Sequence, residues 1–558
     1  MSAGKAVFEK YSMLLVSSME KVFADKEPLY FPERCAFQGL IGENISFQVA
    51  LSADIKRKEK VRIKVYGDLE PYIKIRRVVS APSEYPAHPE KDGNYIKCEP
   101  GLYPDILREL GKDGEAVILP KIWQSFWIDV NITDKIQEGV HPVGISILKD
   151  DDTVCVEVTA NVEVIPIKLP KLTLYHTEWF HCDCLADYYD VEPFSERHWE
   201  ILKNFIDVYV KRGGNTILTP VFTPPLDTDV GGERTTVQLV EIAESDGEYL
   251  FDFKNLERWI TLCTGAGIEY FEIAHFFTQW GAGFAPKIMV KKGDKLIRRF
   301  GWDTPAVGEY TAFLKQFIPA LKEFLSKKNL LDRTFFHISD EPREEHLEEY
   351  EKARLSVLPY LKDCKVIDAL SDYEFYERGL VDIPVCAINH IEPFIENKVP
   401  HLWSYYCTSQ YVSVSNRFFA MPLARTRIYG ALVYKFGIEG ILHWGFNFYN
   451  NQFSKKAVNP YEVTDCEGSF PSGDAFLVYP GEDGIPEESI RLMTMNEALQ
   501  DYRALKLLET EVGREAVIEL LEEGLAEPMT FSEYPKSQEY LITLRRKINS
   551  ILMGNNKA

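Results

Sequence analysis

The sequence predicts a multidomain protein, with an N-terminal β-sandwich, a (β/α)8 TIM-like barrel and a C-terminal helical tail. The chain of 558 residues is several times the size of a typical domain. Short segments with strand-like alternation fill the first 170 residues, a pattern typical of a β-sandwich. From Leu172 onward, short apolar strands alternate with longer helical segments, which indicates a parallel sheet.

The first predicted domain spans residues 1–170. Its interpretation as all-β depends on six alternating segments separated by turn residues, namely Ile45–Ser52, Val61–Tyr66, Ile73–Val79, Ser125–Ile132, Val143–Leu148 and Val154–Ile165. The run IPIKLP at Ile165–Pro170 contains two prolines and is predicted to be the linker that leaves the domain. No catalytic cluster occurs here, so we interpret this domain as an accessory module.

The second predicted domain, residues 171–510, contains eight strand candidates, the number that closes a (β/α)8 barrel. The strands are predicted at Leu174–Trp179, Thr216–Thr219, Tyr270–His275, Thr334–Ile338, Lys365–Leu370, Val385–Ile388, His401–Tyr405 and Gly440–Trp444. The clearest helices are predicted at Glu196–Lys211, Leu256–Ala266, Thr311–Lys328, Glu344–Leu358, Arg417–Phe436 and Ile490–Glu509.

Two long insertions, Pro220–Gly247 and Phe276–Gly308, follow the second and third predicted strands. They are expected at the face where a barrel builds its pocket. Residues 511–558 have apolar residues at helical spacing and are predicted to pack on the barrel as a small helical tail.

Composition excludes several classes of function. A net charge of −22 repels phosphate backbones, so we expect no nucleic-acid partner. No segment is long and apolar enough for membrane insertion, and the N-terminus lacks a signal-peptide pattern. Ten cysteines without regular spacing fit a reducing compartment, so a cytoplasmic protein is expected. The oligomeric state cannot be predicted from these features.

The central motif is TFFHISDEP, Thr334–Pro342, in which a short apolar strand is followed at once by Asp340 and Glu341. Catalytic residues of barrels lie where strands end. This Asp-Glu dipeptide occurs once in the chain, so it is not a by-product of acidic composition. The alternative is a structural role, in which the two acids cap the helix predicted to begin near Glu344.

Aromatic and polar side chains gather at the other predicted strand ends. Four of the nine tryptophans, Trp179, Trp280, Trp403 and Trp444, fall at or near these ends. An indole stacks on the C–H face of a sugar, while neighbouring carboxylates and amides bind its hydroxyls. We therefore expect a carbohydrate pocket, although each tryptophan alone could equally cap the barrel core.

A divalent metal is the rival interpretation of the strand ends. His176, His181 and His275 could hold a metal together with Asp183 of the HCDC sequence. However, no H-x-H or H-E-x-x-H spacing occurs, and C-x-C is not the usual zinc spacing. We therefore predict no metal and no other cofactor.

Adjacent carboxylates suggest an unusual form of glycoside hydrolysis. Most glycosidases place two carboxylates on opposite sides of the scissile bond, which neighbouring residues of an extended chain cannot easily do. The longer Glu341 can protonate the glycosidic oxygen, while Asp340 holds a group of the substrate. A 2-acetamido group fits, because its carbonyl oxygen can attack C1 and form an oxazolinium ion.

The chain resembles glycoside hydrolase family 123, the β-N-acetylgalactosaminidases, and a related group of uncharacterised bacterial domains. The resemblance covers most of the chain and depends on five pieces: HTEWFHCDCLADY from His176 to Tyr188, Gly214-Asn215-Thr216, HISDEP from His337 to Pro342, Trp403-Ser404-Tyr405, and GILHWGFN from Gly440 to Asn447.

The resemblance implies a retaining, substrate-assisted exo-hydrolase of terminal β-linked N-acetylgalactosamine on a glycan or glycolipid, without a metal. By position, Asp340 is similar to the residue that orients the acetamido group and Glu341 to the acid/base. Candidate substrate-binding residues by the same resemblance are His176, Glu178, Asn215, His275, Trp280, Trp403, Tyr405 and Trp444.

Three alternatives remain open at this stage. The enzyme could be another hexosaminidase, or a two-carboxylate glycosidase that uses Asp368, Asp372 or Glu178 as its second group. The protein could also be a non-catalytic glycan-binding protein whose sandwich binds the sugar, although Trp123 and Trp127 are the only candidate aromatic platform there.

Overall fold

The computed structural model describes residues 5–8, 10–29, 31, 35–229 and 231–555. The chain folds into two compact units. The first comprises Met1–Thr173, Tyr411–Lys435 and Glu487–Ala558, and the second comprises Leu174–Gln410 and Phe436–Pro486. The three-domain division expected from the sequence stays a prediction.

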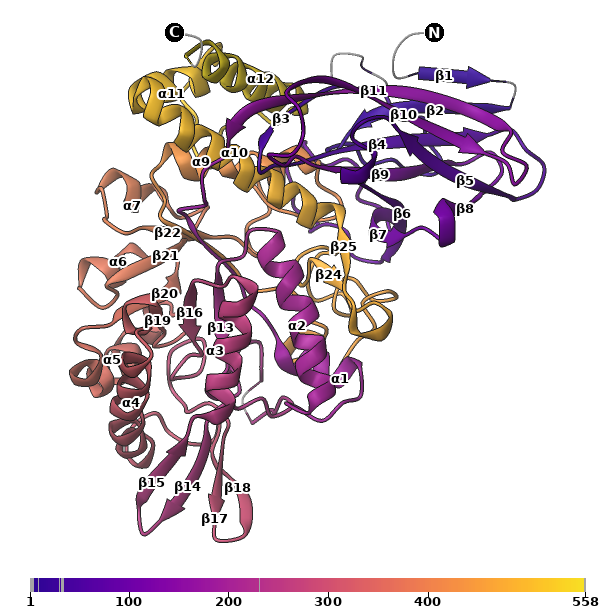
Figure 1. Cartoon of the computed structure of the whole chain (residues 1–558). Helices are drawn as coiled ribbons and strands as arrows, with labels where there is room; N and C mark the ends of the chain where they lie inside the picture. The colour runs from indigo at the N-terminus through magenta and orange to yellow at the C-terminus, as the bar shows by residue number, and fades with distance from the viewer. Residues whose placement is uncertain (1–4, 9, 30, 32–34, 230, 556–558) are drawn as a thin grey trace. The chain divides into compact units, whose positions relative to one another are not determined.

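Two sheets make up most of the first unit (Figure 1). One has the strand order β1-β2-β4-β9-β6-β7-β25 and the other the order β3-β11-β10-β5-β8. Their bounds are β1 Lys5–Phe8, β2 Tyr11–Ser17, β3 Ala36–Ile41, β4 Asn44–Ala53, β5 Glu59–Tyr66, β6 Ile73–Ser83, β7 Gly101–Glu109, β8 Glu115–Ile118, β9 Trp123–Asn131, β10 Gly139–Leu148, β11 Val154–Lys168 and β25 Glu487–Ser489.

Both sheets contribute side chains to one hydrophobic cluster. Phe47 and Phe126 come from the first sheet, and Ile145 and Val162 come from the second, and all four are fully buried. The alternation that predicted these strands is the alternation that fills this core. The β-sandwich interpretation of the two sheets stays a prediction.

The predicted linker Ile165–Pro170 is for the most part the end of strand β11. This strand pairs with β3 in parallel, and its register shifts between Ile165 and Lys168. The irregularity contains Pro166, which has no N–H to donate to a ladder. The two prolines therefore mark a disturbed strand end rather than the start of a linker.

In the described part of the first unit the α-helices are α8 Leu423–Arg427, α9 Tyr429–Lys435, α10 Ile490–Val512, α11 Arg514–Glu522 and α12 Gln538–Asn555. The C-terminal tail was expected to pack on the barrel, but α12 is bonded to the N-terminal sheets. Arg545 donates to Glu43 at 2.6 Å, and Ser17 donates to Gln538 at 2.7 Å. Helical periodicity identifies an apolar face without identifying the surface that covers it.

Eight parallel strands form a nearly closed barrel in the second unit (Figure 1). They are paired in the order β12-β23-β22-β21-β20-β19-β16-β13. At the remaining seam the Asn215 N–H donates to the His176 carbonyl at 3.2 Å. The bounds are β12 Tyr175–Glu178, β13 Thr216–Thr219, β16 Tyr270–Ile273, β19 Thr334–Phe336, β20 Lys365–Leu370, β21 Ile383–Ala387, β22 Trp403–Tyr405 and β23 Gly440–His443.

The helices of the second unit follow the barrel strands in sequence. They are α1 Cys182–Tyr188, α2 Glu196–Lys211, α3 Lys254–Ala266, α4 Glu309–Lys327, α5 Leu347–Leu361, α6 Tyr373–Glu377 and α7 Glu392–Glu396. Helix α2 begins where Ser195 caps it by accepting the His198 N–H, and α3 ends at Gly267, whose φ of 116° favours glycine. The helix predicted over 417–436 forms instead as α8 and α9, beginning directly after Pro422.

The two insertions, together with the residues directly after the first, contribute a separate four-stranded sheet in the order β15-β14-β17-β18, which projects from the barrel (Figure 1). Its strands are β14 Glu241–Ser245, β15 Glu248–Asp252, β17 Ile288–Lys292 and β18 Lys295–Phe300. Sequence analysis placed both insertions but predicted none of these strands. A further short strand, β24 Val478–Tyr479, also belongs to the second unit.

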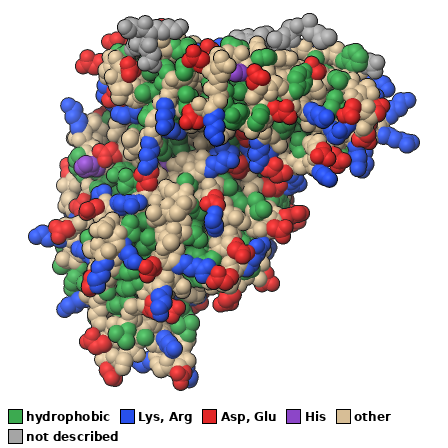
Figure 2. All heavy atoms as spheres, in the orientation of Figure 1, with side chains coloured by type: hydrophobic (Ala, Val, Ile, Leu, Met, Phe, Trp, Pro, Cys, Tyr) green, Lys and Arg blue, Asp and Glu red, His purple; other side chains and the backbone are tan. Residues whose placement is uncertain are grey.

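Acidic and basic side chains are interspersed on the face shown in Figure 2, and the coloured atoms of that face show no extended basic area. Among the described residues, no helix combines the length and the apolar character that a bilayer crossing needs.

Candidate active site

A cavity of about 270 Å³ lies where the carboxyl ends of the barrel strands meet their loops. This is the face at which barrels build their active sites. The wall includes residues that end or follow six of the barrel strands, namely Trp179, Asp227, Gln279, Trp280, Asp340, Glu341, Tyr405 and Trp444.

Asp340 and Glu341 lie in an irregular loop after strand β19. The loop is fixed from the next strand, because Oδ1 of Asp368 accepts the N–H groups of Ile338 at 2.9 Å and Ser339 at 3.2 Å. A 3₁₀ helix begins at Glu344 with Arg343 as its N-cap, and helix α5 follows at Leu347, so neither acid occupies a cap position. The capping alternative for the two acids is therefore wrong.

The backbone around the pair is held in an uncommon conformation. Glu341 has a φ of 44° and Trp280 a φ of 55°, which are left-handed values rarely adopted by side chains of this size. Trp280 donates its N–H to the Asp340 carbonyl at 2.9 Å, and Glu341 donates its N–H to the Ala369 carbonyl at 3.1 Å. Such conformations persist where the surroundings over-determine them, and they concentrate at functional sites.

Glu341 is half-buried and is oriented by a tyrosine from the other side of the barrel. The Tyr405 hydroxyl donates to Oε1 of Glu341 at 2.7 Å. Tyr405 is itself almost fully buried at the end of β22, so the hydrogen bond has a fixed origin. Among the described residues nothing is bonded to Oε2 of Glu341, which leaves this atom for a ligand of the cavity.

Asp340 is buried beside Glu341, with 8% of its surface exposed. Burial, and after it the neighbouring charge of Glu341, raise the pKa of Asp340 well above its usual range. Two carboxyls this close cannot both ionise easily, so the pair keeps one proton to a higher pH than an isolated carboxyl would.

A buried cation lies beneath the pair. His337 donates Nε2–H to Glu272 at 2.6 Å, and its Nδ1 lies 3.4 Å from Asp368. Burial alone would lower the pKa of His337, but the nearby carboxyl groups of Asp368 and Glu272 raise it to about 9. Glu272 also accepts from the indole of Trp179 at 2.7 Å. The network fixes the residues beneath the pair, and within it the imidazole of His337 is protonated at neutral pH.

His275 stacks on His337, with 4.1 Å between ring centroids. It is fully buried, and neither ring nitrogen has a hydrogen-bond partner among the described residues. Burial and the charge of His337 hold the pKa of His275 well below its usual range. His275 is therefore a neutral ring that supports His337, and it does not line the described cavity.

Three of the eight predicted substrate-binding residues line the cavity, namely Trp280, Tyr405 and Trp444. Trp280 remains 36% exposed, and its ring meets Phe453 edge-on at 5.8 Å. The indole of Trp444 donates to Asp474 at 2.9 Å. These contacts orient two indoles along the wall of the cavity.

His176, Glu178 and Asn215 are not among the described residues of the cavity wall. The Asn215 amide accepts the His176 N–H at 2.8 Å and donates to the Leu174 carbonyl at 2.9 Å. The imidazole of His176 lies 3.4 Å from Glu178. These side chains hold the seam between β12 and β13, and their predicted contact with substrate stays a prediction.

Trp403 is also absent from the described cavity wall. It is 1% exposed and stacks on Tyr175, with 5.1 Å between rings and 14° between their planes. The glycine at position 440 makes room for it, because a Cβ there would lie 2.1 Å from the indole. Trp403 therefore fills the barrel interior.

The cavity also contains residues that sequence analysis did not select. Asp227 comes from the insertion after β13, Gln279 precedes Trp280, and Gln452 and Phe470 follow β23. Gln279 could have been selected by its place at a strand end. Asp227 could not, because its insertion has neither periodicity nor a motif.

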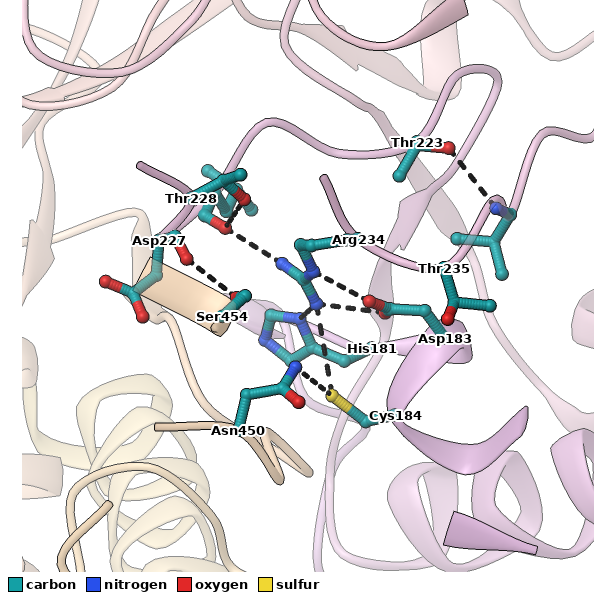
Figure 3. Close-up of polar contacts among 12 residues, drawn as sticks. His181, Asp183, Cys184, Thr223, Asp227, Thr228, Arg234, Thr235, Asn450 and Ser454 are labelled. Carbon is teal, nitrogen blue, oxygen red and sulfur yellow. Dashed lines mark hydrogen bonds and ion pairs between the residues drawn. The ribbon is translucent and has the colours of Figure 1, made fainter. Parts of the chain in front are cut away.

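Two residues of the metal interpretation, His181 and Asp183, lie in a different cluster, shown in Figure 3, whereas His176 and His275 lie outside it. Arg234 donates to both carboxylate oxygens of Asp183 at 2.7 and 2.9 Å and lies 3.0 Å from Nδ1 of His181. Burial and Arg234 lower the pKa of His181 to about 4. Among the described residues, no group of three or more His, Cys, Asp or Glu side chains is arranged to hold a metal.

The sequence matches the family model of the glycoside hydrolase 123 catalytic domain over residues 179–508. The chain belongs to glycoside hydrolase family 123. This match includes the strand ends and loops that supply the cavity wall.

One solved structure of the same family agrees with this fold. A family 123 glycoside hydrolase from Clostridium perfringens, described in work on glycolipid glycan hydrolysis, matches with a TM-score of 0.73 and 17% identity, covering 98% of each chain. A β-glucuronidase of Parabacteroides merdae matches with a TM-score of 0.32 and 10% identity, covering 82% of this chain and 50% of that one, which is too weak to inform the fold. No curated protein matches the sequence.

Proposed function

We propose that this glycoside hydrolase releases terminal β-linked N-acetylgalactosamine from a glycan or glycolipid by a retaining, substrate-assisted mechanism. Glu341 is the acid/base, and Asp340 stabilises the 2-acetamido group. The observation that carries the proposal is the placement of both carboxyls on one wall of one cavity, with unlike surroundings. Asp340 is buried, and Glu341 is half-exposed and bonded to Tyr405.

The different surroundings of Asp340 and Glu341 determine which of the two carboxyls holds the shared proton. In the free protein the pair retains one proton, because burial and mutual repulsion oppose full ionisation. When the acetamido N–H donates to Asp340, the carboxylate form of Asp340 is favoured, and the proton moves to Glu341. Glu341 is then the protonated acid that a departing glycosidic oxygen needs.

The first step forms one bond and breaks another. The acetamido carbonyl oxygen attacks C1, the bond from C1 to the glycosidic oxygen breaks, and the leaving oxygen takes the proton of Glu341. The oxazolinium ion that results is positive, and the Asp340 carboxylate lies beside it in a poorly solvated position. Water then attacks C1, the bond from C1 to the acetamido oxygen breaks and regenerates the 2-acetamido group, and the water gives a proton to Glu341, which restores the acid and retains the anomeric configuration.

The cavity contents support this assignment over a two-carboxylate mechanism with the acids first considered. Asp368 is fully buried and accepts from two N–H groups and from the Tyr350 hydroxyl. Asp372 and Glu178 are not among the described residues of the cavity wall. Asp227 does line the wall, so among the acids of the cavity it is the candidate for a second carboxylate.

The decisive experiment measures nitrophenol release from the β-GalNAc and β-GlcNAc aryl glycosides, together with inhibition by GalNAc-thiazoline, an analogue of the oxazolinium ion. Turnover with tight thiazoline inhibition is expected. Turnover without inhibition would favour a two-carboxylate glycosidase. A preference for the β-GlcNAc glycoside would indicate another hexosaminidase. Binding without turnover would leave a glycan-binding protein.

Two further expectations belong to the proposal. We propose that the two N-terminal sheets form an accessory β-sandwich. Trp127 of this unit is fully buried and donates to Asp129, so it offers no aromatic platform for sugar binding. Trp123, the other ring of that candidate platform, is half-buried, so any glycan binding by residues 1–170 would depend on this one ring. The cytoplasmic location stays a prediction.

A further inference from the structure

Two polar groups of the cavity wall have unused hydrogen-bonding capacity and no part in the proposed chemistry. Oδ2 of Asp227 accepts the Phe453 N–H at 3.0 Å, whereas Oδ1 has no hydrogen bond among the described residues. The side-chain amide oxygen Oε1 of Gln279 accepts the Asp227 backbone N–H at 2.7 Å. Because that N–H requires an acceptor, the amide orientation is fixed with its NH₂ group turned the other way.

The NH₂ group of Gln279 is a buried donor without a partner among the described residues. Gln279 is 5% exposed and lines the same cavity as Asp227. A buried donor left unsatisfied costs about 1–3 kcal/mol, so its retention on a cavity wall points to a ligand acceptor. The free acceptor of Asp227 and the free donor of Gln279 thus belong to two hydrogen-bonded residues that line the same cavity.

The backbone that carries Asp227 is held before any ligand arrives. Arg234 donates to the Leu226 carbonyl at 2.9 Å, and the Ser454 hydroxyl donates to the Asp227 carbonyl at 2.7 Å (Figure 3). Arg234 is itself fixed by both oxygens of Asp183. The Leu226 carbonyl, the Asp227 N–H and the Asp227 carbonyl are thus three successive backbone groups that are all hydrogen-bonded. A loop held in this way loses little freedom on binding, which favours affinity.

We propose that Asp227 and Gln279 form a subsite for sugar hydroxyls, in which Oδ1 of Asp227 accepts from and Nε2 of Gln279 donates to the bound hexosamine. The inference rests on the proposed function and adds to it the residues that recognise ring hydroxyls away from the acetamido group. A hydroxyl is both donor and acceptor, so this pair can satisfy one hydroxyl or two neighbours.

The surroundings suit this role. Trp280 follows Gln279 directly, and its ring contacts Phe453, whose N–H holds the Asp227 carboxylate. Burial raises the pKa of Asp227 to about 6, while Arg234 and the Phe453 N–H act against that rise. Asp227 is therefore mostly ionised at neutral pH, as an acceptor must be. Hydrogen bonds to a charged group discriminate strongly between a hydroxyl and its absence.

The test compares Asp227→Ala, Asp227→Asn and Gln279→Met with wild type on β-GalNAc aryl glycosides and on their 3-, 4- and 6-deoxy analogues. We expect Asp227→Ala to lower kcat/KM about 10- to 100-fold, largely through KM. One deoxy analogue should show a similar loss with wild type and little further loss with the variant. Asp229→Ala is the matched control, since Asp229 is two residues away, pairs with Lys455 and is absent from the described cavity wall.

Several outcomes overturn the inference. Equal losses for all deoxy analogues in wild type and variants would show that Asp227 and Gln279 contact no hydroxyl. A loss of about 10⁴-fold in kcat for Asp227→Ala, restored by azide, would make Asp227 a second catalytic carboxylate. Thermal unfolding midpoints and the milder Asp227→Asn and Gln279→Met changes guard against a folding defect.

Failure of the proposed function can be told apart from failure of this inference. If wild type hydrolyses neither aryl glycoside, the proposed function fails. The subsite is then tested by tryptophan fluorescence during titration with free GalNAc, since Trp280 lies on the same wall. Weaker binding by Asp227→Ala than by Asp229→Ala would still support the subsite, whereas equal binding, or no binding by wild type, would overturn it.

Discussion

The Tyr405 hydroxyl donates to Oε1 of Glu341 at 2.7 Å, which joins the ends of strand β22 and the loop after β19. The two residues are 64 apart in sequence. The hydrogen bond fixes one oxygen of a side chain that otherwise has several rotamers, and it thereby directs the other oxygen into the cavity. Proton transfer is efficient only from a positioned acid, so this bond bears directly on the proposed chemistry.

Replacing Tyr405 with phenylalanine should therefore lower kcat on substrates with poor leaving groups about 10-fold or more, because the acid is no longer held in place. Aryl glycosides with good leaving groups need little proton donation and should lose less. The measurement is kcat across a series of aryl leaving groups, with Tyr376→Phe on helix α6 as control. An unchanged slope of log kcat against leaving-group pKa would argue against this role.

The two acids should fail in different ways when each becomes its amide. Glu341→Gln cannot protonate the leaving group, so natural substrates should lose about 10²–10⁴-fold in kcat while nitrophenyl glycosides retain some turnover. Asp340→Asn cannot stabilise the oxazolinium ion, so both kinds of substrate should lose activity. Assays of both variants on both substrates check this, and an Asp340→Asn variant that spares nitrophenyl glycosides would contradict the assignment.

The alkaline limb of the pH profile should report the shared proton. The active form of the pair has one proton, and burial with mutual repulsion raises the pKa of Asp340 well above its usual range. Activity should therefore be present below this raised pKa and lost as the pH rises through it, as a property of the pair. We expect the apparent pKa of the alkaline limb of kcat/KM to lie well above the usual pKa range of a carboxyl.

Asp227 provides the control for that profile, because its carboxyl faces the same cavity and has a pKa near 6. Asp227→Asn should remove any inflection near pH 6 and leave the alkaline limb in place. The buried His337 and the Asp368 carboxylate also act on Asp340, so the position of the limb includes their charges. A profile that falls near pH 4 to 5 would contradict the shared proton.

The strand-end rule explains which site residues sequence analysis could predict. Asp340, Trp280, Tyr405 and Trp444 each end or follow a barrel strand, and all line the cavity. Trp403 lies near the end of a barrel strand but does not line the described cavity, because its side chain lies deeper in the barrel. It is two residues before Tyr405 on the same strand, so its side chain leaves the same face about 6–7 Å further from the rim and fills the interior.

Tertiary contacts account for what the sequence could not show. Asp227 reaches the cavity because Phe453, 226 residues later, donates to it and because Gln279 accepts its N–H. Neither contact leaves a periodic or spacing signal. The same limit applies to helix α12, whose apolar face was evident but whose partner, the N-terminal sheets, was not. Local patterns specify elements, and long-range pairs specify what those elements meet.

His337 should stabilise the barrel in a pH-dependent way. Its pKa of about 9 in the fold exceeds the value of about 6.5 expected in the unfolded chain, so its stabilising effect is complete below pH 6.5 and is lost as the pH rises through 9. The charges that face it are Glu272, Asp368 and Asp340, with neutral His275 stacked on one side.

The difference in unfolding free energy between wild type and His337→Gln should be larger at pH 6 than at pH 10, by on the order of 3 kcal/mol. Urea unfolding followed by tryptophan fluorescence measures both, and subtracting the variant removes the titration of other groups. A flat difference for His337→Gln would mean that this imidazole is uncharged in the fold.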